Sequence, residues 1–405
     1  MKCGLLGRHL AHSYSPQIHS YLGEYPYEIF EIERDSVENF IKNGDFTGIN
    51  VTIPFKKTVI PFLDALTPIA ERMGAVNTIV RRDGKLIGHN TDYFGLHYTF
   101  SRMGLCLNGK KVLVLGSGGA SVTTVIVLKE LGANVVIISR SGENNYSNLH
   151  LHTDATAIVN TTPVGMYPHA GVSPIDLDIF PHLEGVLDII YNPSKTKLLL
   201  DATQRNIPCE NGLWMLVAQA KEAAEWFTGK KISDDVIPQI YKRMCNKMKN
   251  IILIGMPGCG KTTIGKLLAK ELNREFVDAD AEIIAEAGMS VSEIFEKKRE
   301  YGFREIETKV LTRLGQQSGL VIATGGGCVT KEENYPLLHQ NGTIFWIKRD
   351  TNSLSTNGRP LSQSGKLEEM YRIRKPMYEQ FADFEVTNDG TLEDIVAKIV
   401  KELNK

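Results

Sequence analysis

The chain has 405 residues, which is long for one hydrophobic core and predicts two or three compact domains. Hydrophobic residues make up 42% and charged residues 23%, as in ordinary globular proteins, so neither disorder nor a fibrous repeat is indicated. The 46 lysines and arginines nearly balance the 47 aspartates and glutamates, which argues against a large basic surface for nucleic acid and points to small molecules as ligands.

The six cysteines are spread along the sequence, without a CxxC pair or a cluster with histidine. This pattern argues against a disulfide scaffold or a zinc site and fits reduced thiols in a cytoplasm. The N-terminal residues lack the apolar core of a signal peptide, and no stretch approaches the roughly 20 apolar residues of a membrane span. We therefore expect a cytoplasmic protein that binds neither nucleic acid nor membrane. The sequence does not indicate its oligomeric state.

Strand signals at 2–6, 27–31 and 48–52 alternate with helical patterns in the first hundred residues. Two further apolar runs, 111–115 and 250–254, each lead into a glycine-rich turn followed by a helical pattern. Repeated strand–turn–helix units predict an α/β fold with parallel sheets.

The glycine-rich turn at 116–121 is of the dinucleotide-binding type, although such a turn alone is equally compatible with a tight strand-to-helix connection. The next strand, 135–138, ends in Ser139 and Arg140, where an NAD enzyme usually places an acid for the ribose hydroxyls. Arginine there favours a 2′-phosphate, and hence NADP.

Around this turn, residues 1–231 resemble shikimate dehydrogenases, with motifs in the order of that family. The matching segments are His12 to Pro16 with His19, Asn50 to Lys56, Gly74 to Thr78, Gly88 to Asp92, Asn160 to Met166, Asp188 to Pro193, and Gly212 to Leu216 followed by Gln219. The resemblance implies a two-lobed dehydrogenase with a substrate lobe and a Rossmann-like NADP lobe.

The resemblance also implies a catalytic dyad in which Asp92 orients Lys56, the proton donor. Taken singly, Lys56 fits an exposed loop lysine better than a catalytic residue, and Ser13 and Ser15 fit a helix cap before Pro16 better than a binding site. The implied substrate-binding residues are Ser13, Ser15, Thr52, Asn77, Asp92, Tyr191 and Gln219. The implied NADP-binding residues are Gly116, Ser117, Gly118, Gly119, Ala120, Ser139, Arg140, Ile189 and Gly212.

Two positions depart from the dehydrogenase pattern. Residues 141–155 form a short polar stretch where the family usually has another helix and strand, so we expect the adenosine side of the cofactor pocket to be open. Val122 replaces an arginine that commonly follows the glycine-rich turn and would contact a phosphate.

The turn at 255–262 has the spacing Gly-x4-Gly-Lys-Thr, which lets backbone N–H groups and a helix N-terminus surround phosphate oxygens. Lys261 supplies positive charge and Thr262 a Mg²⁺ ligand. A loop of this kind by itself leaves switches, motors and kinases open.

Downstream of that loop, the sequence resembles shikimate kinases over residues 249–405. The matching segments are Asp278 to Asp280, Phe303 to Glu307, Gly325 to Gly327, Gly358 to Leu361, and Arg374 to Tyr378. Taken singly, Asp278 could be a helix cap, Arg304 a surface charge and the three glycines a plain turn.

The resemblance implies that Lys261 and Asp280 are catalytic, and that shikimate is bound by Asp280, Arg304, Gly326 and Arg374. Mg²⁺ would be held at Thr262 and Asp278. The implied ATP-binding residues are Gly258, Cys259, Gly260, Lys261, Thr262, Thr263 and Arg359, the last on a mobile lid. Residues 351–357 contain no arginine of the kind that many family members carry upstream of Arg359.

Together these features predict a bifunctional enzyme that uses NADP(H), ATP and Mg²⁺ to reduce 3-dehydroshikimate to shikimate and to phosphorylate shikimate. Residues 1–240 would form the dehydrogenase, with 1–100 and 212–240 in the substrate lobe and 101–211 in the NADP lobe. Residues 241–249 would be a linker and 250–405 the kinase. One alternative is a working kinase fused to a non-catalytic, shikimate-binding module, and another is a P-loop switch or ATPase.

Overall fold

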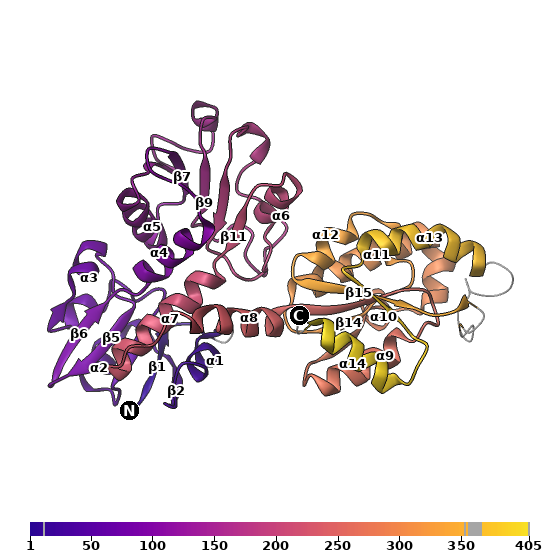
Figure 1. The fold of residues 1–405 in the computed structure, drawn as a ribbon, viewed down its shortest axis with the longest axis horizontal. Coiled ribbons are helices and arrows are strands. Elements are labelled where there is room, and N and C mark those ends of the chain that lie inside the picture. The colour runs from indigo at the N-terminus through magenta and orange to yellow at the C-terminus, as the bar shows by residue number, and fades with distance from the viewer. Residues whose placement is uncertain (11–12, 352–353, 355–366, 404–405) are drawn as a thin grey trace. The chain divides into compact units, whose positions relative to one another are not determined.

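The computed structural model describes residues 1–10, 13–351, 354 and 367–403 (Figure 1). By their contacts the residues group into two units. The first comprises Met1–Pro163, Pro174–Tyr191 and Asp201–Met244, and the second Val164–Ser173, Asn192–Leu200 and Cys245–Lys405. The predicted linker falls largely within helix α8 (Val236–Met248). None of the helices described is both long and apolar enough to cross a membrane.

The first lobe of unit one contains a six-stranded sheet of order β2-β1-β3-β5-β6-β4. The sheet is mixed, because β5 runs antiparallel to both β3 and β6. Asp83 and Gly84, with φ of 50° and 76°, form the two-residue turn that joins β5 to β6. The strands are β1 (Cys3–Gly7), β2 (Tyr27–Glu31), β3 (Gly48–Val51), β4 (Ala65–Leu66), β5 (Thr78–Arg82) and β6 (Lys85–His89). The helices are α1 (Ser15–Ser20), α2 (Val37–Asn43), α3 (Pro68–Met73), α4 (Asp92–Met103) and α7 (Leu213–Thr228).

The second lobe of unit one is a parallel five-stranded sheet of order β11-β10-β9-β7-β8. Within residues 139–156, all of them described, only the short 3-10 helix η3 (Leu149–His152) connects β8 to β9. Strand β8 is therefore the edge of the sheet, in agreement with the short polar stretch in the sequence. The elements are β7 (Lys111–Leu115), α5 (Gly119–Glu130), β8 (Asn134–Ile138), β9 (Ala157–Asn160), β10 (Gly185–Asp188) and β11 (Cys209–Asn211). The division between the units falls within α6 (Lys197–Gln204).

Unit two contains another parallel five-stranded sheet, of order β13-β14-β12-β15-β16. Strand β12 lies between β14 and β15, so its carboxyl end is the switch point at which α/β sheets bind ligands. The strands are β12 (Asn250–Ile254), β13 (Phe276–Asp278), β14 (Val321–Ala323), β15 (Gly342–Lys348) and β16 (Phe384–Thr387). The helices are α9 (Lys261–Glu271), α10 (Ala279–Ala287), α11 (Val291–Gln316), α12 (Asn334–His339), α13 (Leu367–Phe381) and α14 (Leu392–Leu403).

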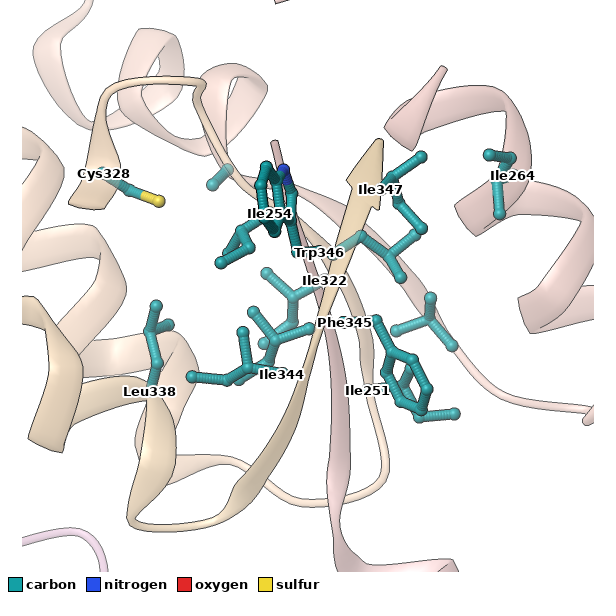
Figure 2. Packing of buried hydrophobic residues seen from close by; sticks show 14 of the residues in the cluster. Ile251, Ile254, Ile264, Ile322, Cys328, Leu338, Ile344, Phe345, Trp346 and Ile347 are labelled. Atoms are coloured by element: carbon teal, nitrogen blue, oxygen red, sulfur yellow. The ribbon is translucent and has the colours of Figure 1, made fainter. Parts of the chain in front are cut away.

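The central strands of this sheet are buried on both faces. Figure 2 shows Phe345 and Trp346 of β15 among isoleucines of β12 and β14. Every residue of β12 is buried, as expected for a parallel strand that helices cover on both sides. This packing holds the carboxyl end of β12, where the phosphate loop begins, in a fixed position.

Candidate functional site

The lysine and aspartate predicted to form a dyad lie together in the first lobe. Lys56 follows β3, and Asp92 is the first residue of α4. The Lys56 Nζ atom lies 2.6 Å from Asp92 Oδ2, and the two side chains are 32% and 14% exposed. The Asp92 N–H donates to Asn90 Oδ1 at 3.1 Å, which holds the start of the helix. The result is a partly buried, charge-assisted pair that a ligand can still reach.

A second network fixes the residue just before Asp92. The Thr91 N–H donates to Asn77 Oδ1 at 2.7 Å, and Asn77 Nδ2 donates to Thr91 Oγ1 at 3.0 Å. The Thr91 hydroxyl also donates to Gln219 Oε1 at 3.2 Å. The structure thus brings together Asn77 and Gln219, two predicted substrate residues, through Thr91. No role was predicted for Thr91. Its position directly before Asp92, within the matched segment Gly88 to Asp92, could have indicated that it belongs to the site.

Tyr14, which lies between the two predicted serines in the sequence, packs against Tyr191. The Ser15 N–H donates to Ser13 Oγ at 3.2 Å, so Ser13 makes a local turn bond as well as offering a hydroxyl. The rings of Tyr14 and Tyr191 meet edge to face with centroids 6.2 Å apart. Burial raises the pKa of Tyr191, and Tyr14 adds to the effect, so Tyr191 stays a neutral hydroxyl. Thr52, the remaining predicted substrate residue, is partly buried at the end of β3.

The first glycine-rich turn has the geometry of a phosphate site. Gly116 has a φ of 105°, and a Cβ there would meet Thr161 Oγ1 at 2.9 Å. Gly118 caps α5 without a side-chain hydrogen bond, and a Cβ at Gly118 or Gly119 would meet nothing within 4 Å. The bare N-terminus of a 12-residue helix therefore faces open space, which fits a pyrophosphate. Ser117 and Ala120 lie in the same turn.

Other residues predicted to bind the dinucleotide lie at strand ends. Ser139 and Arg140 follow β8; Arg140 is exposed, and the Ser139 N–H donates to the Asn144 carbonyl at 3.1 Å. Gly212 packs directly on Ile189, because a Cβ at position 212 would collide with the Ile189 carbonyl oxygen. The structure thus places these two residues, both predicted to bind NADP, in contact with each other.

The second glycine-rich turn leads from β12 into α9. Gly255, Gly258 and Gly260 have φ of 142°, 83° and 104°, conformations that side chains disfavour. Lys261 is 8% exposed, and its Nζ donates to the Gly255 carbonyl at 2.8 Å and the Met256 carbonyl at 3.0 Å. The ammonium is thereby held at the phosphate loop, as a triphosphate site requires.

A cavity of about 690 Å³ opens beside this loop. Of the predicted residues it is lined by Gly258, Gly260, Lys261, Thr262, Thr263, Asp278, Asp280, Arg304, Gly326 and Arg374. Cys259 does not line it; its side chain is buried, and its N–H donates to the Met256 carbonyl at 3.2 Å. Arg359 lies outside the described residues.

Asp278 has two roles in the local structure. Its Oδ1 accepts from the Asp280 N–H at 3.1 Å and caps α10, while its Oδ2 accepts from the Thr262 hydroxyl at 2.8 Å. Asp278 is therefore a helix cap, as the sequence allowed. Two oxygen ligands side by side at a phosphate loop suit Mg²⁺.

The far side of the cavity carries a buried ion pair. Arg304 Nη1 lies 2.6 Å from Glu307 Oε2, and Arg374 Nη1 donates to the Gly326 carbonyl at 3.1 Å. Burial raises the pKa of Glu307, although Arg304 opposes the effect. Arg304 Nε and Glu307 Oε1 are buried and have no hydrogen-bond partner among the described residues, which suits a polar ligand.

Two further charged residues of this cavity, Glu307 and Arg349, were assigned no role from the sequence. Glu307 belongs to the segment Phe303 to Glu307, and its spacing of three residues from Arg304 on one helix face was a signal. Arg349 directly follows β15 and had no sequence signal of its own.

Comparison with known proteins agrees with this geometry. A family model described as shikimate dehydrogenase substrate binding domain matches residues 5–79, and one described as shikimate kinase matches residues 257–404. Shikimate dehydrogenase (NADP(+)) from Clostridium perfringens is 33% identical over 263 residues, which cover 60% of this chain and 97% of that protein.

Solved structures lead to the same family. Shikimate dehydrogenase 1 from Peptoclostridium difficile is 35% identical with a TM-score of 0.56, over 60% of this chain and 98% of that one. Shikimate 5-dehydrogenase from Thermus thermophilus, in complex with NADP(H) and shikimate, is 29% identical with a TM-score of 0.55, over 60% and 99%. The chain therefore belongs to the shikimate dehydrogenase family and carries a shikimate kinase domain after its dehydrogenase part.

Proposed function

We propose that this fused protein catalyses two consecutive steps of the pathway to aromatic amino acids. The first is the NADPH-dependent reduction of 3-dehydroshikimate to shikimate, and the second is the ATP-dependent phosphorylation of shikimate to shikimate 3-phosphate. The observation that carries the proposal is that one chain holds both the Lys56–Asp92 pair and the cavity formed around Lys261, Arg304 and Arg374. The product of the first site is the substrate of the second.

In the dehydrogenase, the dyad handles the proton. Reduced NADP, when bound, supplies the hydride. Lys56 Nζ holds the proton that neutralises the developing alkoxide, and Asp92 orients the ammonium through the 2.6 Å contact. Ser13, Ser15, Thr52, Asn77, Tyr191 and Gln219 are proposed to bind the carboxylate and hydroxyls of the ring.

In the kinase, positioning and charge do most of the work, because phosphoryl transfer needs in-line alignment and neutralisation of oxygens. Arg304 and Arg374 are proposed to hold the carboxylate, with Gly326 as a backbone contact. Asp280 is proposed to hold the ring hydroxyls and orient the attacking oxygen. Lys261 neutralises phosphate charge at the loop. Mg²⁺, when bound at Thr262 and Asp278, neutralises the remaining phosphate oxygens.

The residues present support the assignment of these cofactors. Open space over Gly118 and Gly119 suits a pyrophosphate, and Arg140 suits a 2′-phosphate, which favours NADP over NAD. The backbone of 255–262 and the Thr262–Asp278 pair suit ATP with Mg²⁺. Cys259 is included in the ATP site only through its place in the loop, and Arg359 through the family resemblance alone.

We further propose that the domains run as the sequence suggests, with the dehydrogenase in 1–240 and the kinase in 250–405. The substrate lobe comprises 1–100 and 212–240, and the NADP lobe 101–211.

None of the six cysteines forms a disulfide, which supports assignment to a reducing cytoplasm.

Steady-state assays of both reactions on one preparation test the proposal. Purified protein should reduce NADP⁺ in a shikimate-dependent manner and should consume ATP only when shikimate is present. Absence of shikimate-dependent NADP⁺ reduction, with phosphorylation intact, would instead support a non-catalytic shikimate-binding module. ATP turnover that does not depend on shikimate would favour a P-loop ATPase.

A further inference from the structure

Arg349 lies at the edge of the kinase cavity, at a place where the chain runs beside the phosphate loop. Strands β12 and β15 pair in parallel, with Ile254 opposite Trp346. One residue further along each strand, a Cβ on Gly255 would meet the Ile347 carbonyl oxygen at 2.5 Å. The residues that follow β15 therefore leave the sheet beside the start of the phosphate loop, and Arg349 is the first of them.

Arg349 and the residue before it have different surroundings. Arg349 lines the same cavity as Gly258, Lys261 and Arg374. The preceding residue, Lys348, does not line the cavity and instead pairs with Glu385 of β16 at 2.9 Å. Successive side chains of a strand point to opposite faces, which explains the different environments.

The other two arginines of the cavity already have partners within the protein, whereas Arg349 makes no ion pair within the described part of the chain. Arg304 is paired with Glu307, and Arg374 donates to the Gly326 carbonyl. Arg349 is exposed and makes no ion pair with any residue that the structure describes. Its guanidinium is thus available to an anionic ligand.

We propose that Arg349 binds the terminal phosphate of the nucleotide, the group that is transferred. This inference rests on the proposed kinase function. The cavity that Arg349 lines extends from the phosphate loop to the proposed acceptor residues Asp280 and Arg304, and a transferred phosphate must lie between those two sets. Residues 351–357 contain neither arginine nor lysine, so Arg349 supplies a cation that this stretch of the sequence lacks.

Calorimetric titration of the full chain with Mg²⁺ and either ADP or the imido analogue of ATP tests this assignment. Arg349→Gln should weaken binding of the analogue about tenfold, the loss of one charge-assisted hydrogen bond, while ADP affinity stays nearly unchanged. Arg349→Lys should retain part of the analogue's affinity. Lys348→Gln is the matched control and should bind both nucleotides as the wild type does. Circular dichroism and thermal unfolding of each variant check that the kinase unit has folded.

Three results would overturn the inference. Unchanged affinity of Arg349→Gln for the analogue would show that Arg349 does not contact the terminal phosphate. An equal loss of affinity for ADP would show that the arginine contacts a part of the nucleotide that ADP shares. A wild-type protein that neither binds the analogue nor phosphorylates shikimate would remove the proposed kinase function itself, and the inference with it.

Discussion

Lys56 Nζ and Asp92 Oδ2 lie 2.6 Å apart although 36 positions separate the two residues in the sequence. The end of β3 brings the lysine to one side of the contact, and the start of α4 brings the carboxylate to the other. The hydrogen bond from the Asp92 N–H to Asn90 and the network at Thr91 hold the carboxylate in place. The proton donor of the proposed reduction is therefore oriented before any substrate binds.

Replacing Lys56 should separate the two activities. Lys56→Ala removes the proposed proton donor and should lower kcat/KM for shikimate oxidation by about 10²–10⁴-fold. Phosphorylation of shikimate by the same preparation should not change. Formation of NADPH, followed by absorbance, measures the effect. Lys57→Ala, an exposed neighbour, is the control and should keep both activities. Full oxidation activity in Lys56→Ala would remove the lysine from the mechanism.

The complementary change lies in the phosphate loop. Lys261→Ala removes the ammonium that is held at the Gly255 and Met256 carbonyls and should abolish shikimate-dependent ADP formation while NADP⁺ reduction continues. Lys266→Ala, on the same helix but with an exposed side chain, should leave both rates intact. If Lys261→Ala also stopped NADP⁺ reduction, the two sites would be coupled or the variant misfolded, which circular dichroism separates.

A methyl group at position 327 should disturb acceptor binding in the kinase. A Cβ on Gly327 would fall on the Arg304 guanidinium, so Gly327→Ala must displace that arginine from its pair with Glu307. The KM of Gly327→Ala for shikimate should be about tenfold or more above that of the wild type, whereas its affinity for Mg·ADP should not change. Gly390→Ala is the control, since its Cβ would approach only the side chain of Asp394, at 3.3 Å, and neither residue lines the cavity. An unaltered KM in Gly327→Ala would argue against the role of Arg304.

The choice between NADP and NAD should depend on Arg140. Arg140→Ala removes the charge proposed to meet the 2′-phosphate and should raise KM for NADP⁺ about tenfold, with little effect on KM for NAD⁺. Kinetics with both cofactors measure the ratio. Equal increases for the two cofactors would show that Arg140 contacts a part that they share.

A buried carboxylate in α7 should make the stability of unit one depend on pH. Burial of Glu225 acts to raise its pKa, but hydrogen bonds from the Ile232 N–H, Lys221 and Lys231 outweigh burial and lower the pKa. A carboxyl with a lowered folded pKa stabilises the fold above its unfolded pKa of about 4.3 and loses that contribution as the pH falls through the folded pKa.

Glu225→Gln should therefore reduce the free energy of unfolding at neutral pH by about 1–3 kcal/mol. The difference from wild type should shrink as the pH falls below about 4. Urea unfolding followed by loss of dehydrogenase activity measures it, with the exposed Glu24→Gln as control. A difference that stays constant with pH would mean that the carboxylate charge is not responsible.

The local elements could be predicted from the sequence. The strands at 27–31, 111–115 and 250–254 occur where they were predicted. Residues 112–115 and 251–254 are unbroken apolar runs, which suit a buried strand, whereas 27–31 carries two glutamates and forms an exposed edge strand. The absence of an additional strand between β8 and β9 was also predicted, from the short polar stretch 141–155. The antiparallel pairing of β5 was not predicted, because the Asp83–Gly84 turn was not recognised as a hairpin.

The two glycine-rich turns, with the strands before them and the helices after them, can be predicted from local sequence, because glycine backbone freedom and apolar periodicity are properties of neighbouring residues. The contacts between Asp92 and Lys56 and from Thr91 to Asn77 and Gln219 depend on the folded chain, as does the place of Arg349 in the cavity beside Lys261. These groups come from separate elements, and their distances are set by how the sheets and helices pack, which no spacing along the chain records.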